Sequence, residues 1–298
     1  PAIISGAIAD RAKFTSWAVF VAIWSTLVYF PVAHWVFAFG NKVGDTITGA
    51  GFLASRGVQD FAGGTVVHMS AGFAALAGAL MLGKRKNSEH IPTNIPFVLL
   101  GTGMLWFGWF GFNAGSALST GGSATMAFAT TMMASASAML TWIFFDRLKG
   151  TRVSAMGACI GAVVGLVAIT PAAGFVTVPE SIFFGFITAI VSNTVLNMKS
   201  VKVIDDTLVV FACHGVGGIM GMILTAIFAH GENASLLHGG WGVFGHHMIA
   251  LVLVALFTFF GAMLLYKITD LIIPIRVSEQ SELLGLDISQ HNESLDPR

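Results

Sequence analysis

The sequence has few charged residues. Asp, Glu, Lys and Arg make up 10% of its 298 residues, whereas soluble domains carry about 25%. This shortage excludes an ordinary soluble domain and indicates an integral membrane protein. The 15 Lys and Arg balance the 15 Asp and Glu, so no net charge is available to attract nucleic acid or acidic partners.

Cysteine and catalytic motifs are also scarce. The two cysteines, Cys159 and Cys213, lie in apolar runs, where they are expected as small packing residues, and they exclude a disulfide framework. The sequence lacks nucleophile-elbow, zinc-protease, P-loop and dinucleotide-binding patterns. No enzyme activity, metal site or cofactor is therefore expected.

The start of the chain shows no methionine, basic region or cleavage pattern. The apolar run 1–5 is too short to span a membrane. It is predicted to be the end of a helix whose beginning is absent, and the chain is therefore expected to be truncated at its N-terminus.

Long apolar runs are what the sequence has in abundance. Runs of about twenty residues match the ~30 Å hydrocarbon core as helices and are too long for barrel strands. We therefore predict an all-α integral membrane protein, a polytopic bundle whose 35 glycines permit close helix packing. The eight predicted spans are residues 14–37, 61–83, 95–116, 122–145, 153–172, 179–198, 207–229 and 245–269.

The lysines and arginines alternate between the connections. They precede the first span and follow the second, fourth, sixth and eighth, whereas the connections after the third, fifth and seventh carry none. The loop after the first span carries only Lys42 and Arg56. By the positive-inside rule, the basic connections and the C-terminus are predicted to be cytoplasmic in a multi-pass cell-membrane protein.

Two histidines lie inside apolar spans, and each follows an aspartate by eight residues: His68 follows Asp60, and His214 follows Asp206. Ionisable groups at membrane depth are costly and mark functional sites. Because the second span runs inward and the seventh outward, the two units enter from opposite faces, as in an inverted repeat. Eight residues at ~1.5 Å each then bring both imidazoles to mid-membrane.

This arrangement predicts a pore for a small solute that carries protons or forms hydrogen bonds. The alternatives are that each histidine is a satisfied core residue and that the equal spacing is chance. Each aspartate is predicted to be an N-cap or a partner of the helix dipole rather than an ion ligand.

Aromatic residues gather near the outer end of the third span. Trp109, Phe112 and Ser116 share one helical face, where aromatic rings attract a cation and the hydroxyl accepts a hydrogen bond; the alternative for the tryptophan is an interfacial aromatic belt. Phe37 ends the first span on the same side, and the belt is favoured there. Solvated or interfacial positions are predicted for His230, His238, His246 and His247.

The stretches DFAGGTVVH, GWFGFNAGSA, HGVGGI and IRVSEQSELLGLDISQHNES resemble the ammonium transporter family (Amt/Mep, with the Rhesus proteins as relatives). The resemblance runs from Pro1 through the tail. It implies eleven helices in two inverted repeats plus a long last helix, so residues 1–269 form a membrane domain that lacks its first helices, and 270–298 form a cytoplasmic tail. It also implies a homotrimer, passage of ammonium or methylammonium as neutral amine, and a PII-type cytoplasmic regulator.

The resemblance further implies roles for single residues. His68 and His214 match twin histidines that line an apolar lumen, and Phe112 matches the inner of two stacked gate phenylalanines, the outer one belonging upstream of Pro1. Ser116 matches the hydroxyl of an outer recruitment site, in which Phe37 stands where tryptophan is common. Motif or supporting positions are matched by Trp109, Asn113, Asp60, Thr65 and Asp206.

Three other functions are weighed beside transport. The same pore could belong to an ammonium sensor that signals through the tail, or to a Rhesus-like channel for NH3 gas. A more distant alternative is a bis-histidine haem or quinone protein with His68 and His214 as axial ligands, although the histidines are too few for a multi-haem bundle.

Overall fold

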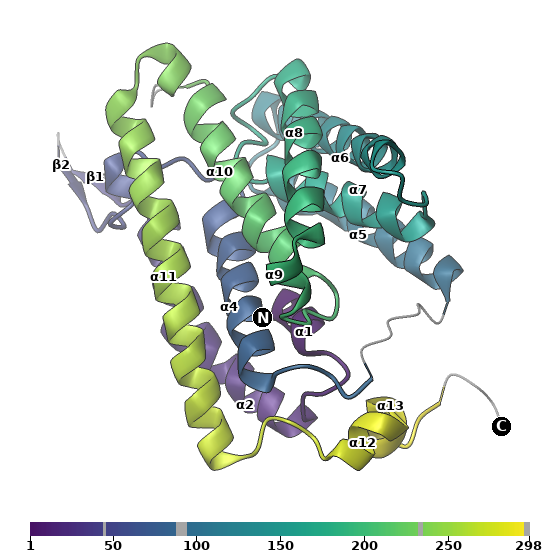
Figure 1. Cartoon of the computed structure of the whole chain (residues 1–298). Coiled ribbons are helices and arrows are strands. Elements are labelled where there is room, and N and C mark those ends of the chain that lie inside the picture. Colours follow the sequence, from purple (N-terminus) through teal and green to yellow (C-terminus); the bar gives the residue numbers. More distant parts are fainter. Residues whose placement is uncertain (44–45, 88–93, 232–234, 295–298) are drawn as a thin grey trace.

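The computed structural model of the chain is a bundle of long helices (Figure 1). It describes residues 1–43, 46–87, 94–231 and 235–294. Helices satisfy every backbone polar group within one segment, as a lipid environment requires. The longer helices are α2 (Phe14–Trp24), α3 (Phe30–Phe37), α4 (Ser70–Leu82), α5 (Ile95–Gly115), α6 (Gly122–Leu148), α7 (Ala155–Ile169), α8 (Val178–Asn197), α10 (Gly217–Phe228) and α11 (Trp241–Ile272). The shorter helices are α1 (Ala2–Ile8), α9 (Lys199–Lys202), α12 (Glu279–Leu284) and α13 (Leu286–His291).

Each predicted span corresponds to a helical segment. In the described part of the chain, seven helices are long and apolar enough to cross a membrane. The remaining segment, α7, corresponds to the fifth predicted span and has 15 residues. This is roughly 22 Å of helix, which is shorter than the ~30 Å hydrocarbon core. The prediction of an all-α polytopic membrane protein is confirmed, whereas the number of full crossings is confirmed only for the seven longer segments.

Three helices contain short π-helical segments. The segment η1 (Ser25–Tyr29) joins α2 to α3, η3 (Gly64–Met69) opens the α4 helix, and η4 (Phe211–Val216) opens the α10 helix. Such wide turns are rare and frequently occur at functional sites. The last two contain the two membrane histidines, so both histidine helices begin in the same unusual way.

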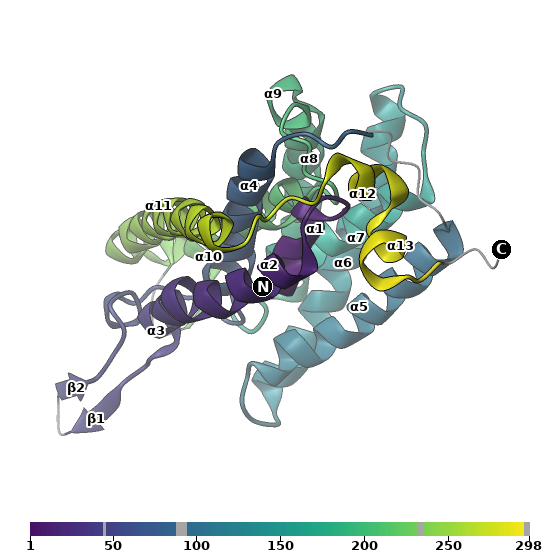
Figure 2. The ribbon, with the colours of Figure 1, turned by 90° about the horizontal axis from the view of Figure 1, so that it is seen from below.

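The two histidine helices form the centre of the bundle. In the most apolar stretch of each helix, 72% of the residues are buried for η3–α4 and 61% for η4–α10, but only 6% for α5. Figures 1 and 2 show α11 and α5 at opposite edges in both views. The centre therefore holds the candidate residues, while α5 exposes most of its side chains.

The central helices run antiparallel and touch backbone to backbone. Segment η3 packs against α10, and η4 packs against α4, so the start of each helix lies beside the continuation of the other. A Cβ atom added at Gly72 would lie 2.2 Å from the backbone nitrogen of Gly215. Only glycine permits this approach, and it brings the two π-helical segments together.

A β-hairpin follows α3. Strand β1 (Asn41–Val43) pairs antiparallel with β2 (Thr46–Thr48), and a 3₁₀ turn, η2 (Ala54–Arg56), comes after it. The prediction contained no strands, because three-residue strands are too short to produce a visible alternation of apolar and polar residues. The hairpin is an addition outside the helical bundle.

One end of the bundle, here called the basic end, holds four of the basic connections. The Arg85 guanidinium lies 2.6 Å from the Asp205 carboxylate and 3.1 Å from that of Asp10. Arg276 donates to the carbonyl oxygens of Leu82 (2.6 Å) and Lys84 (2.7 Å). The connections before the first span and after the second, sixth and eighth were predicted to share one side of the membrane, and these four are in contact; the cytoplasmic location of that side stays a prediction.

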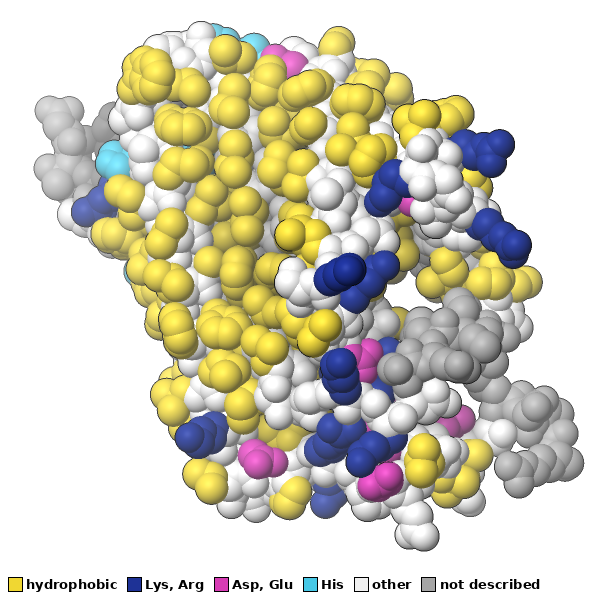
Figure 3. All heavy atoms as spheres, viewed as in Figure 1, with side chains coloured by type: hydrophobic (Ala, Val, Ile, Leu, Met, Phe, Trp, Pro, Cys, Tyr) yellow, Lys and Arg dark blue, Asp and Glu magenta, His cyan; other side chains and the backbone are white. Residues whose placement is uncertain are grey.

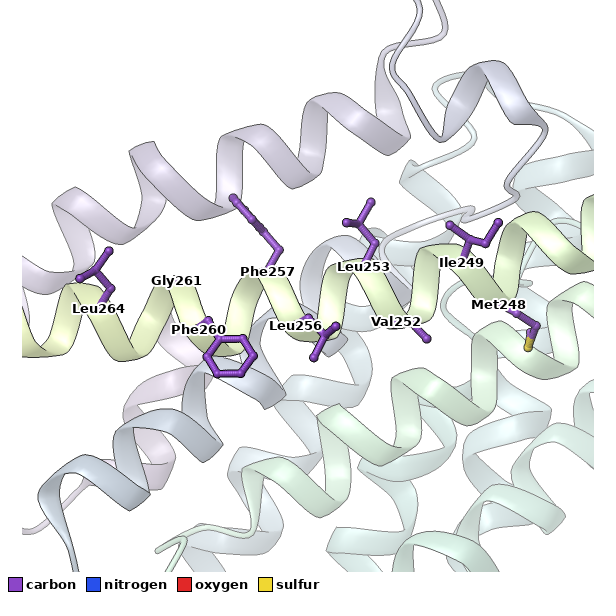
Figure 4. A pocket seen from close by; sticks show the side chains of 9 residues that line it. All are labelled: Met248, Ile249, Val252, Leu253, Leu256, Phe257, Phe260, Gly261 and Leu264. Atoms are coloured by element: carbon purple, nitrogen blue, oxygen red, sulfur yellow. The ribbon is translucent and has the colours of Figure 1, made fainter.

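The surface separates apolar from charged side chains. Figure 3 shows apolar side chains over α11 and α10, with Lys and Arg toward the lower and right parts of the same face. An apolar groove of about 1020 Å³ runs along α11 from Met248 to Leu264 (Figure 4). It is lined by hydrocarbon side chains with one thioether, as expected of a lipid-facing helix, so it is not a candidate site.

Candidate substrate pore

The two membrane histidines meet directly. The Nδ1 atoms of His68 and His214 lie 3.2 Å apart, the ring centroids are separated by 5.3 Å, and His68 is 1% exposed. The structure thus brings together the residues that the equal spacing predicts to meet. Their part in transport stays a prediction.

Thr170, which the sequence analysis did not select, holds the other side of His68. Its Oγ1 atom lies 2.8 Å from the Leu166 carbonyl oxygen, 3.0 Å from Trp109 Nε1 and 3.1 Å from His68 Nε2. All three contacts are buried. The only sequence signal was a hydroxyl within an apolar span, which is too common among packing residues to single out a site.

These contacts assign the histidine tautomers. The hydroxyl has one proton, which it donates to the Leu166 carbonyl, and it accepts from the indole N–H of Trp109. It then accepts from His68 Nε2–H, which leaves His68 Nδ1 as an acceptor for Nδ1–H of His214. Since each neutral ring carries one N–H, His214 Nε2 is left as an acceptor.

Asp60 caps the π-helical segment that carries His68. Its Oδ1 atom accepts from the backbone N–H groups of Gly63 (2.9 Å) and Gly64 (2.6 Å), and Oδ2 accepts from the N–H (2.8 Å) and hydroxyl (2.5 Å) of Thr65. The predicted capping contacts are present for Asp60, and the predicted supporting residue Thr65 contributes two of them. Each carboxylate oxygen therefore accepts two hydrogen bonds.

Asp206 stands in the matching place before η4. One of its oxygens accepts from the N–H of Phe211 (2.7 Å), whereas Oδ1 has no partner among the described residues. Burial raises the pKa of Asp206. The two aspartates therefore occupy equivalent helix starts, but Asp60 is much more completely hydrogen-bonded.

The predicted aromatic residues surround His68. The Trp109 ring stacks on it at 5.2 Å between centroids, and the Phe112 ring meets it edge-on at 6.1 Å. A cavity of about 550 Å³ beside them is lined by apolar side chains including Ile3 and Leu105. Trp109 is therefore part of the histidine site and not of an interfacial belt.

A second cavity, of about 480 Å³, contains Ser116 and Asp60 and is here called the outer cavity. Ser116 donates to the carbonyl oxygen of Phe112 (2.8 Å), which connects the two cavities through one turn of helix. Phe37 is not on its wall, because it packs into an apolar cluster of the bundle. Phe39 lines the outer cavity, and a part for Phe37 in recruitment stays a prediction.

Asn113 ties the aromatic helix to its neighbour. It is fully buried, and its amide nitrogen donates to Thr131 Oγ1 of α6 at 2.9 Å. This contact fixes the rotation of α5, which carries Trp109 and Phe112. Asn113 is thus placed as a support and does not reach the histidines in any described contact.

One of the outer histidines is buried. His247 is 0% exposed, and its Nε2 accepts from the backbone N–H of Gln59 at 2.9 Å. The predicted solvated or interfacial position is wrong for it, because α11 begins at Trp241 and places His247 on the inward face of its second turn. His230 is half exposed and lies 3.0 Å from the Glu180 carboxylate.

The contact between the two histidines bears on the haem alternative. In the described ranges, no group of three or more His, Cys, Asp or Glu side chains is arranged to hold a metal ion. Two ring nitrogens on opposite sides of one metal ion would lie about 4 Å apart, but those of His68 and His214 are 3.2 Å apart and hydrogen-bonded. A haem plane does not fit between them.

Comparisons with known proteins identify the family. The model of the Ammonium Transporter Family matches residues 1–295. The chain belongs to the ammonium transporter family. It is 44% identical to a putative ammonium transporter of Methanothermobacter thermautotrophicus over 98% of this chain and 71% of that protein. It is also 44% identical to an ammonium transporter of Aquifex aeolicus, over 98% of the chain and 67% of the relative.

Solved members of the family have the same fold. Candida albicans Mep2 superposes with a TM-score of 0.83 at 34% identity, covering 94% of this chain and 63% of that one. A structure named Sensor Amt Protein superposes with a TM-score of 0.85 at 32% identity, covering 97% and 73%. The chain thus spans a little under two thirds of Mep2 and somewhat more of the other relatives. It belongs to a family of transporters rather than enzymes.

Proposed function

We propose that the protein transports ammonium across a membrane through the pore marked by His68 and His214, and that it accepts methylammonium as well. The observation that carries this proposal is the direct hydrogen bond between the buried His68 and the partly buried His214, which come from antiparallel helices. Family membership supports the substrate, because the relatives are named ammonium transporters.

The outer cavity is the recruitment site in this proposal. Ammonium is strongly hydrated, and moving an unpaired cation into low dielectric costs many kcal/mol. Ser116 and the charge of Asp60 replace part of its water shell, and the rings of Trp109 and Phe112 then offer only weak cation–π attraction. Loss of a proton before the apolar lumen avoids most of the electrostatic cost.

The paired imidazoles then carry hydrogen bonds along the lumen. In the assigned tautomers, His214 Nε2 accepts a hydrogen bond from the passing NH3, whereas His68 is saturated by Thr170 and His214. A proton accepted at His214 Nε2 would make that ring a cation whose Nδ1–H still donates to His68 Nδ1, so the charge would strengthen the hydrogen bond between the two rings. This coupling is how we infer that the pair links amine passage to proton transfer.

The membrane placement completes the proposal. We place the basic end and residues 270–298 on the cytoplasmic side of the cell membrane, residues 1–269 within the bilayer, and three copies in a homotrimer. We propose that a PII-type regulator binds the tail, which Arg276 attaches to the end of α4.

The test is flux in proteoliposomes that contain the purified protein. An inward ammonium gradient should produce a saturable current, and methylammonium should compete with it. A flux of NH3 without current would favour the Rhesus-like gas channel, and no ammonium-dependent flux at all would contradict the proposal.

A sensor is the second candidate, favoured by the close superposition on Sensor Amt Protein. In that case the tail contacts of Arg276 would carry the signal. Signalling that persists in a variant without flux would support a sensing role.

A further inference from the structure

The outer cavity contains an amide group that the described chain does not satisfy. Gln59 lines this cavity and is 7% exposed. Its Oε1 atom has no hydrogen-bond partner among the described residues. Because a buried carbonyl oxygen without a partner is costly, this amide points to a ligand that donates a hydrogen bond.

The backbone holds Gln59 in place. Its N–H donates to Nε2 of the fully buried His247 at 2.9 Å, and His247 Nδ1 lies 3.1 Å from the Val243 carbonyl oxygen. His247 of α11 therefore fixes the backbone of Gln59, the residue before Asp60. The side chain is presented from a fixed backbone and not from a free loop.

The neighbouring groups make the outer cavity suited to a cation. All four donors to Asp60 come from its own helix start, so its charge acts at a distance and its oxygens are already occupied. Ser116 gives its proton to the Phe112 carbonyl and keeps its lone pairs for a ligand. Phe61 and Phe175, whose rings meet edge-on at 5.2 Å, also line the cavity and add aromatic faces.

We propose that Gln59 is a specificity-determining residue for ammonium, with its Oε1 accepting one N–H of the cation in the outer cavity beside Ser116. The inference rests on the proposed transport function. Ammonium presents an N–H in every orientation, whereas methylammonium must also turn its methyl group away from the acceptors, so ammonium can meet Ser116 and Gln59 together more easily. Gln59 would thus favour the smaller cation.

The test is Gln59→Met, which keeps an unbranched side chain of similar length and removes the amide. Currents and methylammonium uptake are measured in proteoliposomes as a function of concentration. We expect the KM for ammonium to rise about tenfold, equivalent to about 1.4 kcal/mol, with the maximal rate within about twofold of wild type. The KM for methylammonium should rise less, by about threefold, equivalent to ~0.7 kcal/mol.

Two further variants make the result decisive. Gln280→Met makes the same substitution on the exposed surface of α12 and should leave both KM values unchanged. Gln59→Glu retains acceptor oxygens, so its KM for ammonium should equal or fall below that of wild type at neutral pH.

An unchanged KM in Gln59→Met, or a loss of maximal rate at unchanged KM, would overturn the inference while leaving the proposed function intact. If Gln59→Met fails to fold, Gln59→Glu decides: a KM at or below wild type supports the acceptor, and a tenfold rise contradicts it. No flux in the wild-type protein would instead overturn the proposed function itself.

Discussion

The hydroxyl oxygen of Thr170 lies 3.1 Å from Nε2 of His68, on the side of the ring opposite the other histidine. Since the hydroxyl proton is directed to the Leu166 carbonyl, Thr170 accepts from His68 and thereby decides which ring nitrogen of each histidine carries a proton. The residue that caps the C-terminus of α7 thus controls the chemistry of a pair formed by two other helices.

Replacing Thr170 by valine should lower ammonium current about tenfold, because the isosteric side chain leaves the N–H groups of His68 and Trp109 without an acceptor, at a cost of ~1–3 kcal/mol. Thr170→Ser is the matched control and should retain most of the current. The measurement is concentration-dependent current in proteoliposomes. Equal currents in the valine variant would show that the tautomers are set elsewhere.

Replacing His68 or His214 by alanine should abolish electrogenic ammonium transport, because the remaining imidazole loses its Nδ1 partner and the proton path is broken. Solid-supported membrane electrophysiology measures the current, with thermal unfolding as a check on folding. Currents at the wild-type level in both variants would contradict the role of the pair.

Asp60→Ala should destabilise the protein by roughly 2–4 kcal/mol. The substitution removes a buried, charged acceptor from the backbone N–H groups of Gly63, Gly64 and Thr65 and from the Thr65 hydroxyl. Asp206→Ala should cost less, since Asp206 accepts from Phe211 and leaves Oδ1 unpartnered. Unfolding midpoints in detergent compare the two. Equal losses would contradict the difference in capping.

The sequence was sufficient for the central geometry because membrane physics constrains it strongly. The apolar runs and the alternating basic loops set the order and direction of the helices, and direction alone placed His68 opposite His214. The capping role of Asp60 followed from its position before an apolar run. These are properties of single segments and of the bilayer.

The remaining contacts depend on how helices rotate against one another, which one sequence does not specify. Thr170 looked like any hydroxyl in a span, and the sequence did not indicate that Phe39, two residues after Phe37, would line the outer cavity. His247 was misplaced because α11 begins four residues earlier than predicted, which moves it into the buried face of the helix.

The Asp205–Arg85 pair predicts a loss of stability in acid. Burial alone would raise the pKa of Asp205, but hydrogen bonds from the side chain and backbone of Arg85 hold it below its usual value. A depressed folded-state pKa contributes stability that is present above the unfolded value of ~3.9 and is lost as pH falls through the folded pKa. Asp205→Asn should therefore show a weaker decline of the unfolding midpoint below about pH 4. Parallel acid curves for the two proteins would contradict this assignment.

Arg276 predicts how the tail is held. Its guanidinium donates to the carbonyl oxygens of Leu82 and Lys84 and pairs with Glu282 at 2.9 Å. Arg276→Gln should weaken the attachment by roughly 1–2 kcal/mol, so that α12 opens more often and chymotrypsin cleaves it several times faster. Lys199→Gln, on the exposed α9, is the control for loss of a basic side chain. Unchanged cleavage in Arg276→Gln would mean that the tail is held by its backbone contacts, such as Val277 N–H to the Arg11 carbonyl oxygen at 3.1 Å.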